Sequence, residues 1–93
     1  MRHAKRTDSN HAAIRQALRD AGWDVEDLSH VGHGVPDLVA EKDERLIWVE
    51  IKDGKKSPSA RRLTDKEHWF HELLVRCGIT VRVVTSVDDV AKL

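Results

Sequence analysis

Two carboxylates and one ammonium group interrupt apolar segments of the chain at positions where they could meet. Asp37 begins one apolar segment, and Glu50 and Lys52 end the next one. If the two segments pair as a hairpin whose turn is centred on Asp43 and Glu44, the register places Asp37 directly opposite Glu50. Side chains alternate along a strand, so Lys52 shares the face of Glu50. The three groups are therefore predicted to converge at one end of a sheet.

The chemistry that suits this trio is metal-assisted hydrolysis of a phosphodiester. Two opposed carboxylates repel each other, and a divalent cation between them removes the repulsion. Mg²⁺ takes one or two carboxylates together with waters and a substrate phosphate, so Asp37, Glu50 and the backbone carbonyl of Ile51 are the predicted ligands of Mg²⁺ or Mn²⁺. Lys52 would position or deprotonate the attacking water, or stabilise the developing charge. Glu-x-Lys alone is typical of a solvated strand pair, and only the joint geometry favours a site.

The rest of the sequence supplies elements that can position the trio. The predicted helices run from Asp8 or Ser9 to about Ala21 and from Thr64 to Cys77, and the predicted strands span residues 23–28, 37–41, 46–52 and 80–84. Thr64 and Glu67 have the spacing of a capping box, and Trp69 and Leu73, with Phe70 and Leu74, are predicted to form the buried face of the second helix. A short helical turn follows Ser86. The order αβββαβ predicts one α/β domain over residues 1–93, a mixed sheet flanked by helices, with residues 1–7 as a flexible arm.

The charge of the chain is zero in sum but uneven in distribution. Residues 52–66 carry six basic and two acidic side chains, which favours phosphate binding on that side of the molecule, although an ordinary solvated loop is the alternative. The predicted DNA-binding residues are Lys55, Lys56, Arg61, Arg62 and Lys66. His33, which stands between two glycines, is a further candidate for a phosphate contact, against the alternative of a plain turn histidine.

Composition excludes several other classes of protein. No apolar run approaches the roughly 18 residues of a membrane span, and no secretory signal is visible, so we expect no membrane partner and a cytoplasmic location. The single cysteine, Cys77, precludes an internal disulfide. The histidine pairs His30/His33 and His68/His71 lack companion ligands at the spacings of known zinc motifs.

Two segments of the sequence resemble a known family. Gly34-Val35-Pro36-Asp37-Leu38-Val39 followed by Val49-Glu50-Ile51-Lys52-Asp53-Gly54 resembles the PD-(D/E)xK nuclease superfamily and, more narrowly, the VRR-NUC domains of small phage and bacterial nucleases. The resemblance extends over nearly the whole chain, from residues 6–10 through 58–64 to 86–88. It implies a restriction-endonuclease-like core, with Asp37 and Glu50 as metal ligands and Lys52 as the catalytic lysine.

The first helix departs from the pattern of that superfamily. Many members carry a metal-binding Glu there, whereas this chain offers Asn10 and Gln16, so Asn10 is an additional candidate for the metal or its water. Lys66 and Glu67 lie where the superfamily often has a Gln or Lys facing the site, although the capping box alone would account for Glu67.

The resemblance implies a divalent-metal-dependent DNA endonuclease, encoded by a phage or a bacterium and acting on branched or structured DNA such as junctions or flaps. A core this small and the need for two cuts at a junction favour a homodimer. Two hypotheses from other classes are a non-catalytic DNA-binding module on the same fold and a protein-interaction domain. The intact trio counts against the first, and salt-dependent DNA binding would count against the second.

Overall fold

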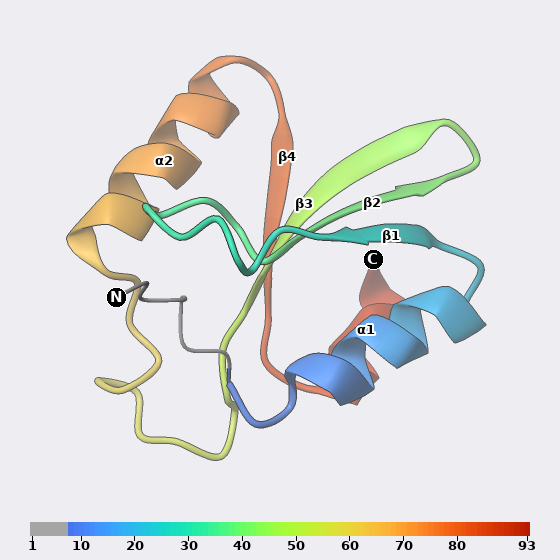
Figure 1. The fold of residues 1–93 in the computed structure, drawn as a ribbon, viewed down its shortest axis with the longest axis horizontal. Helices are drawn as coiled ribbons and strands as arrows, with labels where there is room; N and C mark the ends of the chain where they lie inside the picture. The colour runs from blue at the N-terminus through green and yellow to red at the C-terminus, as the bar shows by residue number, and fades with distance from the viewer. Residues whose placement is uncertain (1–7) are drawn as a thin grey trace.

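A four-stranded sheet with a long helix on either side forms the body of the molecule (Figure 1). The computed structural model describes residues 8–93, and the predicted arm, residues 1–7, lies outside the described residues. In chain order the elements are α1 (His11–Asp20), β1 (Asp24–Asp27), β2 (Leu38–Lys42), β3 (Arg45–Ile51), α2 (Asp65–Arg76), β4 (Thr80–Val84) and the 3₁₀ helix η1 (Val87–Lys92). The predicted αβββαβ order and the α/β class are confirmed.

The sheet has the order β1-β2-β3-β4 and is mixed, as predicted. The first three strands form an antiparallel meander, and β4 runs parallel to β3. A parallel neighbour needs a crossover connection, and α2 supplies it. Within residues 8–93 the structure has no helix long and apolar enough to cross a membrane.

The hairpin of β2 and β3 has the predicted register. Lys42 pairs with Arg45, and the pairing continues to Leu38 opposite Val49. The turn Asp43–Glu44 has φ values of 51° and 66°, the left-handed conformation at both positions that matches the twist of a two-residue hairpin. Both strands are therefore one residue longer at the turn than the sequence predicted.

At the other end of the hairpin, Asp37 and Lys52 lie just beyond the strands instead of within them, which corrects the predicted strand ends. In this register Pro36 would face Ile51, and a proline has no N–H to donate to a neighbouring strand. The carboxylate of Asp37 instead accepts the Ile51 N–H, with an Oδ2–N distance of 2.8 Å. The side chain of Asp37 thus replaces a backbone contact at the point where the pairing ends.

Two other predicted boundaries shift. The cap of α1 is Asn10, not Asp8 or Ser9, and Asp8 instead accepts the backbone N–H of His11 through its carbonyl. The first strand is shorter than predicted, because the Trp23 N–H donates to the carbonyl of Leu18 and closes the end of α1. Trp23 is buried against that helix and does not belong to the sheet.

The second helix begins as predicted but buries a different face. Thr64 and Glu67 make both hydrogen bonds of the capping box. The buried residues are Glu67, His71 and Leu74, so the prediction is confirmed for Leu74. It is wrong for Trp69, which is 61% exposed, and Phe70 and Leu73 are half-buried. The helix turns its polar side chains towards the sheet because that face of the sheet carries charged groups.

The apolar core lies on the α1 side of the sheet. Its buried members are Ile14, Leu18, Trp23, Leu38, Ala40, Ile47, Val49, Ile51, Val84 and Val90. The residues of β3 in this core alternate with Trp48 and Glu50, which face α2. The two faces of the sheet therefore differ: the face towards α1 carries the apolar core, and the face towards α2 carries polar groups.

Candidate active site

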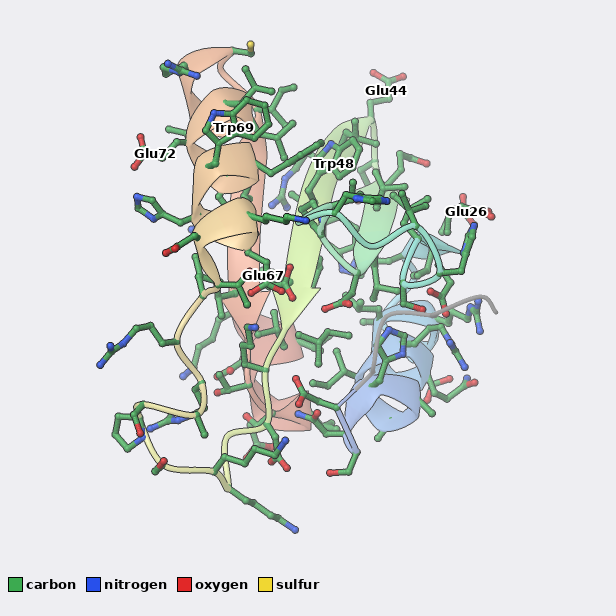
Figure 2. The ribbon with its side chains drawn as sticks, turned by 60° about the vertical axis from the view of Figure 1, so that its left-hand side comes forward. Glu26, Glu44, Trp48, Glu67, Trp69 and Glu72 are labelled. Atoms are coloured by element: carbon green, nitrogen blue, oxygen red, sulfur yellow. The ribbon has the colours of Figure 1, made fainter. Side chains whose placement is uncertain are left out.

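A pocket between the ends of the strands and the first turn of α2 brings the predicted trio together. It has a volume of about 240 Å³ and is lined by Asp8, Asp37, Glu50, Ile51, Lys52, Thr64 and Glu67. Figure 2 shows the side chain of Glu67 reaching from α2 towards the end of β3. Three elements that are distant in the sequence thus meet at one polar pocket.

Asp37 enters this pocket from the loop that joins β1 to β2 and crosses to α2 (Figure 1). Its carbonyl accepts the Leu28 N–H at 2.7 Å, and its carboxylate, in a residue only 3% exposed, accepts the Ile51 N–H. The loop rests on the helix at Gly34, where a Cβ would lie 2.4 Å from the carbonyl oxygen of Lys66. A side chain at Gly34 would push the loop off α2 and carry Asp37 with it.

Glu50 points to the same pocket from β3 and is only 1% exposed. The Nε2 atom of His71, itself buried, lies 3.5 Å from its Oε1 and forms an ion pair when the imidazole is protonated. The sequence predicted two bare carboxylates that repel each other. Instead, Asp37 has a backbone donor and Glu50 has an imidazole neighbour. His71 was missed, although its place four residues after Glu67 puts both on one helix face.

Lys52 makes a short ion pair across the pocket. Its Nζ lies 2.8 Å from Oε1 of Glu67, and the two side chains are 13% and 6% exposed. The same oxygen of Glu67 accepts the Thr64 N–H at 2.9 Å. Glu67 therefore caps α2 and faces the site at once, so the two interpretations of this residue are compatible. The cap fixes the carboxylate, and the carboxylate fixes the ammonium group.

Asp8 is a pocket residue that sequence reasoning considered only as a helix cap. Its carboxylate lies 3.3 Å from Nζ of Lys56, which connects the pocket to the basic loop. Asn10, in contrast, is not among the residues that line the pocket. Its Nδ2 donates to the carbonyls of Lys52 and Thr85 at 3.1 and 3.0 Å, which ties the ends of β3 and β4 to α1. Asn10 thus positions the strand that carries Lys52.

The predicted DNA-binding residues fall into two groups. Lys55, Lys56 and Arg62 are exposed on the loop after β3, with Arg61 half-buried beside them, whereas Lys66 lies on α2. The start of this loop is fixed by Asp53. The Lys55 backbone N–H, followed by the Ser9 hydroxyl and nearby lysine charges, lowers the pKa of Asp53 from its ordinary value. His33 is exposed and does not line the pocket of the trio.

The donor atoms of the pocket fit a hard divalent cation. Two buried carboxylates are oxygen donors, and Mg²⁺ usually takes one or two carboxylates from the protein and the rest from water and phosphate. Within residues 8–93 no three His, Cys, Asp or Glu side chains are arranged to hold a metal ion by themselves. Asp37 and Glu50 are thus suited to Mg²⁺ or Mn²⁺ shared with a substrate, and the described histidines form no zinc cage.

Comparison with known proteins supports the resemblance that the motifs indicated. No protein-family model matches the sequence, and no curated protein matches it. Among solved structures, a chain described as a VRR_NUC domain is similar to this one with a TM-score of 0.69 and 26% sequence identity. The similarity covers 92% of this chain and 95% of the other. The resemblance to VRR-NUC domains is therefore confirmed by the fold over nearly the whole length.

Proposed function

We propose that the chain is a divalent-metal-dependent DNA endonuclease in which Asp37 and Glu50 bind Mg²⁺ or Mn²⁺ and Lys52 acts on the scissile phosphate. The convergence of these three groups carries the proposal. Two carboxylates, 3% and 1% exposed, line one pocket together with an ammonium group. Carboxylate oxygens are the protein ligands that Mg²⁺ prefers, and the ammonium group suits the charge of a phosphate. The similarity to a VRR_NUC domain supports a nuclease in particular.

The side chains of the pocket have separable tasks. A bound divalent ion would polarise the phosphate and make a water easier to deprotonate. Lys52 is held by Glu67 in an ion pair, which is an interaction of its ammonium form. Of the roles open to it, this favours stabilisation of the negative charge that develops on the phosphate oxygens. His71 orients the carboxylate of Glu50 from the helix side.

The basic loop supports binding to a nucleic-acid backbone. Contacts from Lys55, Lys56 and Arg62 to phosphates give an affinity that depends on salt and carries little sequence preference. A domain of 93 residues covers only a short piece of duplex, so we assign a homodimer acting on junctions or flaps, in which the second copy supplies the second cut. The proposed compartment is the cytoplasm of a bacterium or of a phage-infected host.

The test is a cleavage assay on linear, flap and four-way DNAs with Mg²⁺ or Mn²⁺. Asp37→Asn, Glu50→Gln and Lys52→Ala should each remove most of the activity while leaving the fold intact by circular dichroism. The matched control is Glu72→Gln, the same carboxylate-to-amide change on the exposed side of α2. Wild-type cleavage by any of the three variants would contradict the assignment. If the wild type binds DNA in a salt-dependent way but does not cleave it, the non-catalytic DNA-binding module is favoured. If it neither binds nor cleaves DNA, the protein-interaction domain is favoured.

A further inference from the structure

A second pocket, which the proposed cleavage chemistry does not use, lies beside the first turns of α2. Its volume is about 370 Å³, and its lining residues are His33, Asp65, Lys66 and Trp69. Trp69 is the most exposed of the large apolar side chains in the described part of the chain, at 61%. Figure 2 shows it further along α2 than Glu67. The pocket thus places an exposed indole ring beside three polar side chains.

The pocket is held in place by close backbone contacts. Gly34 lies so close to the carbonyl of Lys66 that any Cβ there would clash, and this contact brings the loop that carries His33 against α2. His33, next to it, has a φ of 56°, an uncommon conformation for a residue with a side chain. The ring of Trp69 makes an edge-to-face contact with Phe70, with ring centroids 6.3 Å apart. The loop and the indole that border the pocket thus both have contacts within the protein.

The charges of the lining residues indicate what the ligand is. Lys66 and Asp65 nearly cancel, so the pocket as a whole does not select an anion such as a phosphate. An open indole face favours a flat, uncharged ring, and a carboxylate beside it can accept N–H groups from the edge of that ring. Unpaired nucleobases have both features, and they are bound in this way by aromatic side chains in other nucleic-acid-binding proteins.

We propose that the pocket binds an unpaired nucleobase of the substrate, stacked on the indole of Trp69, with Asp65 and His33 at its edge and Lys66 towards the adjoining phosphate. The proposal rests on the proposed function, because it takes the ligand to be DNA. A base inside an intact duplex is stacked and paired on its own strand, and it cannot enter without being extruded. The pocket therefore selects DNA with unpaired nucleotides, which is the feature that flaps and frayed junctions share.

The position of the pocket relative to the candidate active site supports this selection. Thr64 and Glu67 line the active-site pocket, whereas Asp65 and Lys66, which lie between them in the sequence, line the second one. The two pockets therefore lie on different sides of the first turns of α2. A strand whose phosphate enters the first pocket would reach the second by passing around the start of this helix, so capture of a base on Trp69 would set where the strand is cut.

The experiment measures binding without cleavage, in EDTA, by fluorescence anisotropy. The probes are a forked duplex with two single-stranded arms, the same fork with abasic residues in the arms next to the branch point, and a blunt duplex. Trp69→Ala should weaken binding of the fork by about fivefold or more, the loss expected when one stacked base is released. The wild type should bind the abasic fork more weakly than the fork by a similar factor. Trp69→Ala should bind the fork and the abasic fork with equal affinity. Trp69→Phe should retain most of the affinity, because it keeps a ring.

Two controls separate stacking from other effects. Val75→Ala removes another apolar side chain from α2 that is 60% exposed and lies outside the pocket, and it should bind all three probes as the wild type does. Sedimentation of Trp69→Ala should give the wild-type mass. A changed mass would overturn the proposal, because Trp69 would then belong to a contact between copies. Equal losses on the fork and the blunt duplex, or no loss on either, would overturn it as well.

Cleavage of the same probes in Mg²⁺ or Mn²⁺ keeps the two proposals apart. If the wild type cleaves none of them but the base-dependent loss in Trp69→Ala is seen, the nucleobase pocket stands and the proposed endonuclease function fails. If the wild type cleaves the fork and Trp69→Ala binds fork, abasic fork and duplex as the wild type does, the endonuclease stands and the pocket proposal fails.

Discussion

Replacing Glu67 should lower the free energy of unfolding through two separate contributions, the loss of a helix cap and the loss of an ion pair. Glu67→Ala removes the carboxylate that accepts the Thr64 N–H, and loss of a helix cap costs about 1 kcal/mol. It also leaves the Lys52 ammonium, whose side chain is 13% exposed, without its partner. Breaking a fully buried ion pair costs roughly 3–5 kcal/mol, and the residual access of Lys52 to water lowers this to about 2 kcal/mol. We therefore expect a total of about 3 kcal/mol. Glu67→Gln keeps the acceptor and should cost about 1 kcal/mol, the difference between a charge-assisted and a neutral hydrogen bond.

Urea denaturation of a double-mutant cycle measures the ion pair itself. Lys52→Met should cost less in the Glu67→Gln background than in the wild type, with a coupling energy of about 1 kcal/mol or more. The exposed pair His68–Glu72 on the same helix, with side chains 67% and 60% exposed, is the matched control. Glu72→Gln should change the unfolding free energy by less than about 0.5 kcal/mol.

The reasoning fails if Glu67→Ala costs no more than Glu72→Gln, or if the coupling between Lys52 and Glu67 is zero within error. Zero coupling would mean that the helix cap holds Glu67 without help from Lys52, whereas a Glu67→Ala cost no larger than that of Glu72→Gln would mean that neither contact contributes. Lys52 would then be positioned by its own strand, and its ion pair with Glu67 would not contribute to stability. Cleavage measured on the same variants adds a second readout, because Glu67→Gln should lower activity by loosening Lys52 without touching the carboxylates of the metal site.

Three further predictions concern DNA, metal and acid. Double substitution of Arg61 and Arg62 by Ala should weaken DNA binding and reduce its log–log salt slope by about two, since each phosphate contact contributes roughly 0.9, and an unchanged slope would exclude these contacts. Mg²⁺ should raise the melting temperature of the wild type but not of Asp37→Asn, and an equal rise in both by differential scanning fluorimetry would place the ion elsewhere. The pKa of Asp89 is below its ordinary value of 3.8, chiefly because its carboxylate accepts the Thr85 backbone N–H, an effect that outweighs burial, and also the Thr85 hydroxyl. Ionised Asp89 therefore stabilises the fold above pH 3.8, and this contribution is lost as the pH falls through the folded-state pKa. Asp89→Asn should be less stable at neutral pH and lose less stability on acidification, and parallel pH curves of unfolding free energy for the two proteins would contradict this.

The hairpin was predictable because its information is local. Two strands joined by a two-residue turn have only one register for a given turn position, and the turn Asp43–Glu44 stands out as a polar break between apolar segments. The facing of Glu50 and Lys52 then follows from strand alternation alone. What the register could not show is how Asp37 ends the pairing. That depends on the missing N–H of Pro36 and on a carboxylate that turns back to the chain.

The buried face of α2 was not predictable from hydrophobic periodicity. The pattern of Trp69 and Leu73 favours one face, whereas the structure buries Glu67 and His71. Periodicity assumes that a helix packs by its apolar side, and this assumption fails where the opposing surface carries charges. Asp8 was missed for a related reason, since its approach to the pocket depends on long-range packing that the spacing along the chain does not encode.

The same failure of periodicity explains how one helix can have two tasks. A helix that packed by Trp69 would leave Lys52 and Glu50 facing solvent or an apolar surface, and neither would be held. By packing through Glu67 and His71, α2 gives both charged groups a partner, and the cost is an exposed indole. A ligand stacked on Trp69 would remove this apolar surface from water. The buried polar contacts of α2 and the exposed Trp69 both follow from which face of α2 packs on the sheet. A substrate that fills both pockets would contact two sides of the first turns of this helix.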